Sequence, residues 1–382
     1  MEETHISISP STLKRFFSGK FASRPQISTL DALAQFIGYK GWLSLSRDSN
    51  QEPGIVLVAK PKRSFPHFQP VVWWTIGGIG LAAAILVSIR FIHFGKDKPV
   101  QFTSEVISDG QMPSTVIFHY DISMIEPDEA IIHFSSDPPF YDTIRKNDTI
   151  YSSQYYLPGF YNPSLTVGQK EIATTEVFLP TNGWIAMVSY ERGNPIPEYL
   201  GRDGLFDQGI MHVNPDHEMN NRVNFSDPGV WVNYYKVQDF GALSGDHFHL
   251  ETRIRNSLEE GAKTCQFAYI QVICENGEHL VPLCSVGCVA SISAVFGDKG
   301  FRRMNYDLSS FGTDMDQWHQ INLVVEGKMA TVLLDGAEVM SISYVQPLGL
   351  VKGIRIFFRG CGSVDYVRLF NSQQIKVLDD EF

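Results

Sequence analysis

Cysteine is scarce in this sequence and is absent from its first two thirds. The five cysteines among 382 residues are Cys265, Cys274, Cys284, Cys288 and Cys361. An odd number leaves at least one of them outside any disulfide within the chain. Three residues separate Cys284 from Cys288, which is a poor match to the C-x-x-C pairs of zinc sites. We therefore expect mostly small buried residues, with room for one disulfide.

The sequence also lacks the usual nucleotide-binding and nucleophile motifs, and it has fewer basic than acidic residues. The sequence contains no P-loop, no dinucleotide-binding fingerprint and no G-x-S-x-G element. Its 31 Lys and Arg against 42 Asp and Glu give a net charge of −11, which argues against general nucleic-acid binding. The net charge is distributed unevenly along the chain. It is +4 for residues 1–70 (nine basic, five acidic) and −16 for residues 91–382 (21 basic, 37 acidic). This split indicates that the two parts face different surroundings.

One long stretch lacks charge altogether. Val71–Ile89 (VVWWTIGGIGLAAAILVSI) is close to the roughly 20 apolar residues that cross a bilayer. Trp73 and Trp74 stand at one end, where indole rings favour the membrane interface. Because 70 residues precede this stretch and no small-residue cleavage site follows it, we expect a retained signal anchor, with a single transmembrane helix over residues 71–94.

The flanking residues and the small residues of this helix bear on its orientation and its assembly. Lysine and arginine flank both ends equally, so the positive-inside rule gives no preference. We place the N-terminus in the cytoplasm because the later modules look periplasmic or extracellular. Gly78-x-x-x-Ala82 and Gly80-x-x-x-Ala84 could pack two such helices together as a homodimer, although small residues are common in membrane helices.

The region before the predicted membrane helix divides into a helical head, residues 1–50, and a linker, residues 51–70. Ser11–Phe17 and Ser28–Ile37 are predicted helices, and apolar residues of the second recur at helical spacing. The stretch STLKRFFSGK…STLDALAQFIGYKGWLSL resembles a small helix-turn-helix module that precedes a membrane helix in some bacterial surface proteins. The helix expected before Ser9 is missing, so we interpret the head as a degenerate structural or partner-docking module rather than a DNA-binding one.

Residues 100–190 are predicted to form a first β-sandwich module. Thr115–Asp121 and Glu129–Phe134 have the β-branched and aromatic content of strands. The later run Tyr155-Tyr-Leu-Pro-Gly159-Phe-Tyr161 precedes an alternating strand, Ser164–Val167. This order resembles the immunoglobulin-like PKD (polycystic-kidney-disease) domain, in which we expect Gly159 to supply a positive φ.

The PKD resemblance implies a spacer or a protein contact and no chemistry. Four aromatic residues of the motif are then expected to pack in the core, with a sugar-stacking platform as the alternative: Tyr155, Tyr156, Phe160 and Tyr161.

Residues 200–382 are predicted to form a second, larger sheet module. His247–Arg255 alternates cleanly between apolar and polar residues. Trp318–Glu326 and Thr331–Asp335 flank a Gly-Lys turn, and Asp335-Gly336 is a strong hairpin signal. The order W-x-x-I-x-L-V-V, V-x-L-D-G and G-x-V-D-x-V-R-L resembles the concanavalin-A-like jelly roll of the laminin-G, lectin and glucanase group. That resemblance implies a domain that binds glycans or proteins, sometimes with calcium, or one that hydrolyses β-glucans.

Candidate chemistry in the second module is sparse. Glucanases of this group carry E-x-D-x-x-E, and Glu251 is followed instead by Arg253 and Arg255, so the pair of carboxylates that retaining glycosidases need is absent. His247 and His249 share one face of a strand and could chelate a metal, but a surface pair is the simpler interpretation. We predict no catalytic residue and no metal ligand.

Calcium remains open as a cofactor, because the oxygen-rich loop from His212 to His217 (HVNPDH) could supply ligands. No other cofactor is expected. Trp231, Tyr234 and Tyr235 in the strand VWVNYYKV are the predicted ligand-binding residues, through stacking on a glycan.

The whole sequence thus predicts a mainly β chain with one transmembrane helix, a PKD-like module and a jelly roll. This organisation resembles membrane-anchored surface proteins of the Bacteroidetes type. The predicted function is non-enzymatic binding of a glycan or protein outside the cytoplasm. Two alternatives stay open: a transmembrane regulator that relays outer binding to the head, and a glycoside hydrolase of the glucanase-like group.

Overall fold

The structure is a computed structural model of the chain. It describes residues 100–382 except 108–109, 127, 136–138, 194, 202–204, 208 and 217–222, together with Leu30, Ala34, Gln35 and Lys40. Apart from those four residues, the predicted head lies outside the described residues, as do the whole linker and the membrane helix, and their prediction stays as stated. No helix within the described part of the chain is both long and apolar enough to span a membrane.

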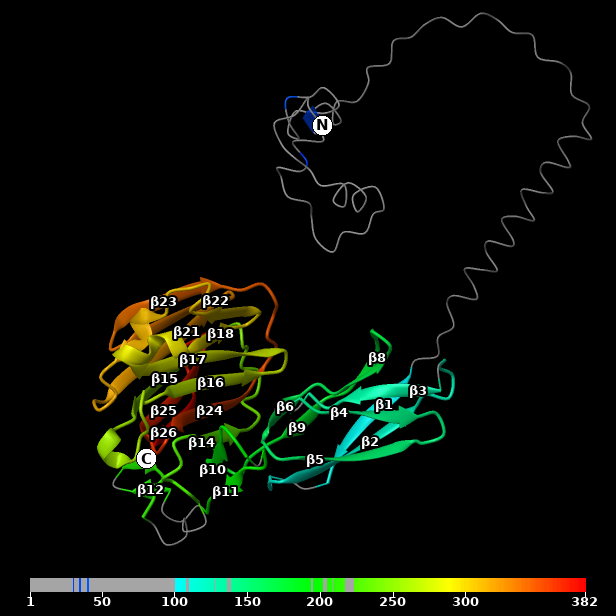
Figure 1. Cartoon of the computed structure of the whole chain (residues 1–382), viewed down its shortest axis with the longest axis horizontal. Coiled ribbons are helices and arrows are strands. Elements are labelled where there is room, and N and C mark those ends of the chain that lie inside the picture. Colours follow the sequence, from blue (N-terminus) through cyan, green and yellow to red (C-terminus); the bar gives the residue numbers. More distant parts are fainter. Residues whose placement is uncertain are drawn as a thin grey trace, which may run out of the picture. The chain divides into compact units, whose positions relative to one another are not determined.

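The prediction of a mainly β chain is confirmed, and residues 90–382 form one compact unit (Figure 1). The first module contains three antiparallel sheets, ordered β1-β2-β5, β4-β3-β7-β8 and β6-β9. Its strands are β1 (Gln101–Val106), β2 (Ser114–Asp121), β3 (Glu129–His133), β4 (Tyr141–Arg145), β5 (Ile150–Tyr155), β6 (Gly159–Tyr161), β7 (Ser164–Val167), β8 (Lys170–Thr174) and β9 (Val177–Leu179).

The core of the first module comes from period-two alternation. In β2 the side chains of Val116, Phe118 and Tyr120 are buried, while those between them are more exposed. They pack in one apolar cluster with Ile132 of β3 and Leu165 of β7, which belong to another sheet. Two sheets therefore face each other across a shared core, as a β-sandwich requires.

The second module is larger and has two main sheets. The nine-stranded sheet runs β11-β10-β14-β24-β16-β17-β18-β19 with β20 beside β17, and the eight-stranded sheet runs β12-β13-β25-β15-β21-β22-β23 with β26 beside β25. Its strands are β10 (Ile185–Tyr190), β11 (Glu198–Tyr199), β12 (Phe206–Asp207), β13 (Ile210–His212), β14 (Val230–Val237), β15 (His247–Arg255), β16 (Ala268–Cys274), β17 (Gly277–Ser285), β18 (Ser293–Phe296), β19 (Lys299–Arg302), β20 (Gly312–Thr313), β21 (His319–Glu326), β22 (Met329–Leu334), β23 (Ala337–Ser343), β24 (Val351–Arg359), β25 (Ser363–Asn371) and β26 (Lys376–Glu381).

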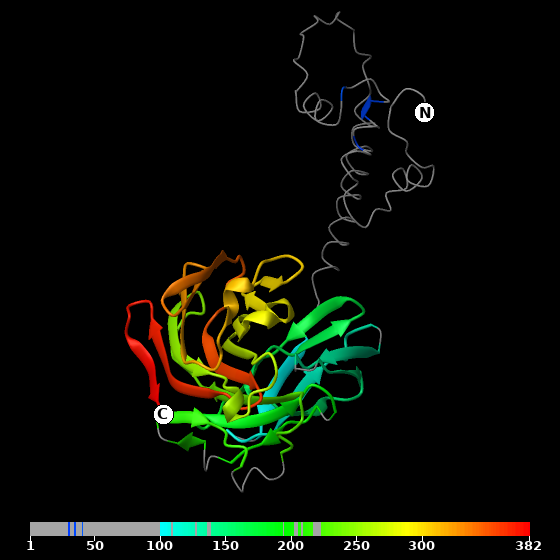
Figure 2. The same cartoon turned by 60° about the vertical axis from the view of Figure 1, so that its left-hand side comes forward.

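The described residues of the second module also form three short 3₁₀ helices: η2 (Leu258–Glu260), η3 (Val286–Ser291) and η4 (Ser309–Phe311). The C-terminal strands, red in Figures 1 and 2, return to the middle of the two sheets. There β24 lies between β14 and β16, and β25 lies between β13 and β15. This return places residues far apart in the sequence on neighbouring strands.

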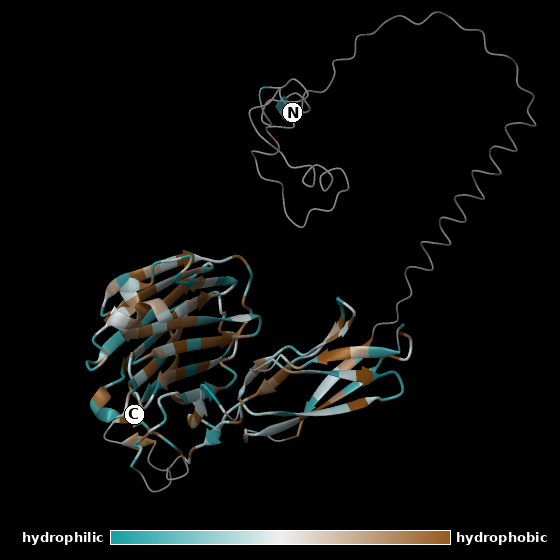
Figure 3. Ribbon diagram, in the orientation of Figure 1, coloured by the Kyte–Doolittle hydropathy of each residue, from teal (hydrophilic) through white to brown (hydrophobic). Residues whose placement is uncertain are grey.

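The two sheets of the second module share one core, and their strands alternate between apolar and polar residues (Figure 3). The alternation predicted for His247–Arg255 is confirmed in β15, where Phe248, Leu250, Thr252 and Ile254 are buried. The predicted turns also form: Asp335 and Gly336 both adopt positive φ, 50° and 82°, between β22 and β23. Such a pair is typical of a type I′ hairpin turn.

Two details differ from the sequence prediction. We placed residues up to 190 in the first module, but β10 pairs along its whole length with β14 of the second module. The core of the second module also contains Trp184. Gly159 does not adopt a positive φ; instead, a Cβ there would lie 3.3 Å from the Tyr161 ring, so close packing accounts for this glycine.

Candidate functional site

Three neighbouring strands of the nine-stranded sheet, β14, β24 and β16, carry aromatic side chains on the face turned away from the core. The register places Phe357 opposite both Asn233 and Tyr269, and Trp231 is two residues before Asn233 on the same face of β14. We call Trp231, Tyr269 and Phe357 the aromatic face. The residues between them on the same strands point to the opposite face and pack in the core. They include Val232, Tyr234, Ile270, Ile356 and Phe358.

The rings of the aromatic face contact one another and remain partly exposed. Tyr269 and Phe357 stack with 4.9 Å between ring centroids and an angle of 12°. Trp231 lies 5.8 Å from Phe357 and 6.0 Å from Tyr269. All three are half-buried. Burial raises the pKa of Tyr269 to about 12, so its phenol stays neutral at ordinary pH.

A polar network adjoins the aromatic face and centres on Arg355. Its Nη2 and Nε donate to Oδ1 of Asn233 at 2.6 and 3.2 Å, and its Nη1 donates to Oε1 of Gln271 at 3.3 Å. The guanidinium lies 4.0 Å from the centroid of Phe357 and 5.1 Å from that of Tyr235. Among the ion pairs of the described residues, none includes Arg355, so amide oxygens and ring faces hold this cation in place.

One border of the aromatic face is formed by an ion pair beside Trp231. The indole Nε1 donates to Oε1 of Glu191 at 3.2 Å, and Arg359 Nε lies 3.3 Å from the same oxygen. The guanidinium of Arg359 also lies 5.7 Å from the Phe267 ring, which is stacked parallel to Trp231 at 6.3 Å. These contacts fix the plane of the indole ring.

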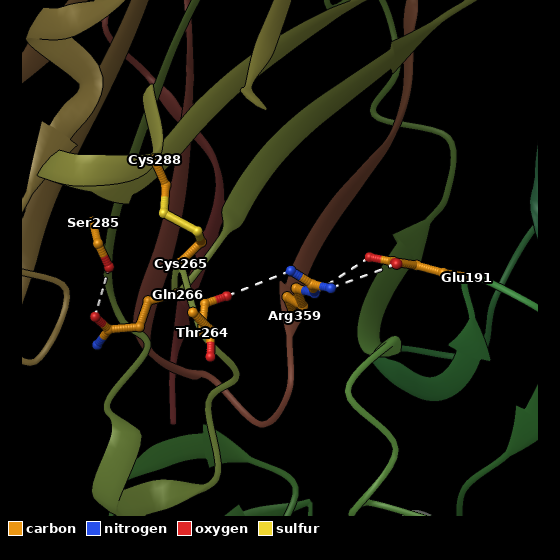
Figure 4. Close-up of a disulfide and its surroundings, with 7 residues drawn as sticks. All are labelled: Glu191, Thr264, Cys265, Gln266, Ser285, Cys288 and Arg359. Atoms are coloured by element: carbon orange, nitrogen blue, oxygen red, sulfur yellow. Dashed lines mark hydrogen bonds and ion pairs between the residues drawn. A yellow bond between two sulfur atoms is a disulfide. The ribbon is translucent and has the colours of Figure 1, made fainter. Parts of the chain in front are cut away.

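A disulfide between Cys265 and Cys288 braces the segment at this border (Figure 4). Cys265 and Gln266 both have positive φ, 74° and 43°, which costs free energy in residues other than glycine. The disulfide and a 2.7 Å hydrogen bond from Ser285 Oγ to Gln266 Oε1 hold them there. One disulfide and three buried free cysteines agree with the sequence prediction of mostly buried thiols.

Beyond Arg355, a cleft of about 520 Å³ lies where the first module meets this sheet. Its walls include Leu157 and Phe160 of the first module and Tyr235 and Glu278 of the second. Asn162 Nδ2 donates to the carbonyl oxygen of Glu275 at 2.7 Å across the same junction. The aromatic face therefore continues into a hollow with apolar and polar walls, as small-molecule sites usually have.

The three residues predicted from the sequence occupy different places. Trp231 is part of the aromatic face. Tyr235 points the same way but is buried beside Arg355. Tyr234 is wrong as a stacking residue, because it has no exposed surface; its hydroxyl donates to the Gly362 carbonyl at 2.9 Å and accepts from the Val213 N–H at 2.9 Å.

Sequence reasoning missed Tyr269, Phe357 and Arg355. A signal was present, because each strand carries an aromatic and a polar residue two positions apart: Trp231-x-Asn233, Tyr269-x-Gln271 and Arg355-x-Phe357. Nothing in the sequence states that these strands are neighbours, however, since their pairing depends on long-range register.

Glu251, the best hydrolase candidate, lies in an ion network on the outer face of the eight-stranded sheet. Its Oε1 accepts from Tyr366 Oη at 2.9 Å and from Arg368 Nη1 at 3.2 Å. Arg368 also pairs with Asp379 at 3.2 Å and with Glu381. One guanidinium thus contacts three carboxylates, an arrangement typical of a structural ion network on a sheet surface.

Of the other candidate ligands, His249 is held by residues of neighbouring strands. His249 Nε2 donates to Asn322 Oδ1 at 2.9 Å, and its ring stacks on Phe370 at 5.2 Å. No cluster of three or more potential metal ligands occurs among the described residues. In the predicted calcium loop Asn214 Oδ1 accepts from the Asp216 N–H at 2.9 Å, and His217 lies outside the described residues, so calcium there stays a prediction.

No protein-family model matches the sequence, and no curated protein is significantly similar to it. Solved structures similar to part of the chain include the carbohydrate binding module CBM66 from Bacillus subtilis (10% identity, TM-score 0.26, 41% of this chain and 91% of that one). Others are galectin LEC-6 of Caenorhabditis elegans (13%, 0.23, 34% and 86%) and an alginate lyase from Corynebacterium sp. (11%, 0.30, 50% and 94%). At these TM-scores the likeness carries no argument about this chain's function.

Proposed function

We propose that this chain is a membrane-anchored, non-enzymatic protein that binds a glycan outside the cytoplasm on the aromatic face. In this proposal Val71–Ile89 is the anchor, the N-terminal head is cytoplasmic, the first module is a PKD-like stalk and the second is a concanavalin-A-like jelly roll. The single observation that carries the binding function is the aromatic face together with the Arg355 network beside it.

A sugar ring presents two kinds of surface to a protein. Its C–H groups form an apolar face that packs on an aromatic ring, and its hydroxyl groups both donate and accept hydrogen bonds. Trp231, Tyr269 and Phe357 supply the rings, while Arg355 and Gln271 supply a donor and an amide within the same face.

The test is binding of the full-length protein to a broad glycan array, with two matched variants. Trp231→Ala removes a half-buried ring of the aromatic face, and Phe370→Ala removes a half-buried ring from the outer face of the other sheet. We expect Trp231→Ala to weaken binding at least about tenfold, or about 1.4 kcal/mol, and Phe370→Ala to leave it unchanged. Absence of glycan binding, or equal binding by Trp231→Ala, would show that the proposal is wrong.

A further inference from the structure

The first module is open on the side between β4 and β5. Each of these strands is the end strand of its own sheet. Three large apolar side chains are exposed there: Phe140 is 52% exposed, Tyr141 64% and Ile150 55%. Large apolar side chains that are exposed together at one place commonly mark an interaction site.

A pocket of about 390 Å³ lies beside this opening and is lined largely by aromatic rings. Phe134 stacks on Phe140 at 5.2 Å and contacts Tyr151 at 5.3 Å, and Tyr155 lies 4.9 Å from Tyr161. Phe140, which lines the pocket, is 52% exposed to solvent. The pocket therefore has mainly aromatic walls and room for a large apolar side chain.

The free edge of β5 runs past the pocket with unpaired backbone groups. Tyr120 N–H donates to the Thr149 carbonyl at 3.0 Å, and hydrogen-bonded pairs alternate along an antiparallel ladder. The N–H and C=O groups of Ile150, Ser152 and Gln154 therefore point away from β2. Among the described strands only β2 pairs with β5.

This edge lacks the features that usually protect a sheet edge. The sequence of β5, IYSSQY, contains no charge and no proline. Natural edge strands commonly carry lysine, proline or a bulge that prevents pairing with another chain. An uncharged, regular edge beside an apolar pocket has the two features of β-strand addition, in which backbone hydrogen bonds give affinity and a pocket gives specificity.

The charge of the module identifies the kind of partner. Residues 100–183 carry three Lys and Arg against eleven Asp and Glu, so they sum to −8. Two of these acids, Asp142 and Asp148, are exposed on and just after β4, and Asp142 Oδ2 accepts from Tyr151 Oη at 2.6 Å beside the pocket. A positively charged segment is attracted to this surface, whereas a second copy of the same acidic module is repelled.

We infer that the free edge of β5 accepts an extended, positively charged protein segment as an added strand, with one apolar side chain of that segment in the aromatic pocket. This inference is independent of the glycan-binding proposal, because the edge lies in the first module and the aromatic face in the second.

The test uses the full-length protein and a phage-displayed library of random dodecapeptides. Ser152→Pro removes an N–H that β2 does not use, so the ladder within the module stays intact. Ser152→Ala is the matched control, and Phe140→Ala tests the pocket through a side chain that is already exposed. Circular dichroism and thermal unfolding check that each variant is folded.

Selected peptides are expected to be positively charged and to alternate apolar with polar residues. They should bind Ser152→Ala as they bind the native chain, and bind Ser152→Pro and Phe140→Ala at least tenfold more weakly. The inference is overturned if no peptide is enriched, if enriched peptides are neutral or acidic, or if folded Ser152→Pro binds them equally well. A dimer of the native chain that dissociates with Ser152→Pro would also overturn it, because the occupant would then be a second copy.

Discussion

A buried histidine in the second module should make the stability of the protein fall as the solution becomes acidic. His279 has no exposed surface and is surrounded by the rings of Phe248, Phe296 and Tyr344 at 5.4–6.0 Å. Its Nε2 lies 3.3 Å from the Gly245 carbonyl oxygen, and its Nδ1 has no hydrogen-bond partner among the described residues. Desolvation by this burial lowers the pKa of His279 from 6.5 to about 4.

The sign and size of the effect follow from this shift. Above pH 6.5 the imidazole is neutral in both the folded and the unfolded state, so it contributes no pH dependence. Between pH 6.5 and about 4 the unfolded state binds a proton that the folded state does not, and the free energy of unfolding falls by 1.36 kcal/mol per pH unit. The total loss at the lower pH is about 3 kcal/mol.

Urea denaturation of the native chain and of His279→Phe, at pH 7 and at steps down to pH 4, measures this loss. Phenylalanine supplies a ring for the same aromatic contacts and removes the titrating group. The drop between pH 7 and pH 4 should be about 3 kcal/mol smaller in His279→Phe. Phe358→Leu, a core control whose ring packs on Tyr234 at 6.0 Å, should lose stability equally at every pH. An unchanged pH dependence in His279→Phe would refute the reasoning.

Two further substitutions test the frame around the aromatic face. Cys288→Ser opens a disulfide that spans 23 residues and should lower the free energy of unfolding by about 3 kcal/mol, measured by urea denaturation; a loss below about 1 kcal/mol would contradict the bracing role. Gly360→Ala, after β24, should cost at least about 2 kcal/mol by the same assay, because φ is +89° and the new Cβ would clash with the Gly261 carbonyl oxygen. If Gly360→Ala has the same free energy of unfolding as the native chain, the backbone of this turn adjusts to the new side chain without cost.

Local features of the second module were predictable from the sequence. The alternation in His247–Arg255 fixed which residues enter the core, because successive side chains of a strand point to opposite faces. Asp335-Gly336 predicted a hairpin, because few other residue pairs adopt positive φ twice in succession. Both signals act within a few residues, so no knowledge of the rest of the chain is needed.

The composition of the candidate site was less predictable, for two physical reasons. The same alternation applied to VWVNYYKV separates Tyr234 from Trp231, so the sequence could have excluded Tyr234. Phe357 and Tyr269, in contrast, reach Trp231 only because β24 inserts between β14 and β16. That insertion is a long-range event of folding, and the pairing of β10 with β14, which the sequence prediction also missed, is another.

Hydroxyl-radical footprinting of the full-length protein, with and without a glycan identified on the array, tests the central claim most directly. The account predicts that the glycan protects Trp231, Tyr269 and Phe357 from oxidation. Tyr366 and Phe370, on the outer face of the other sheet, should react equally in both samples. Protection of Tyr366 and Phe370 without protection of the aromatic face would contradict the account.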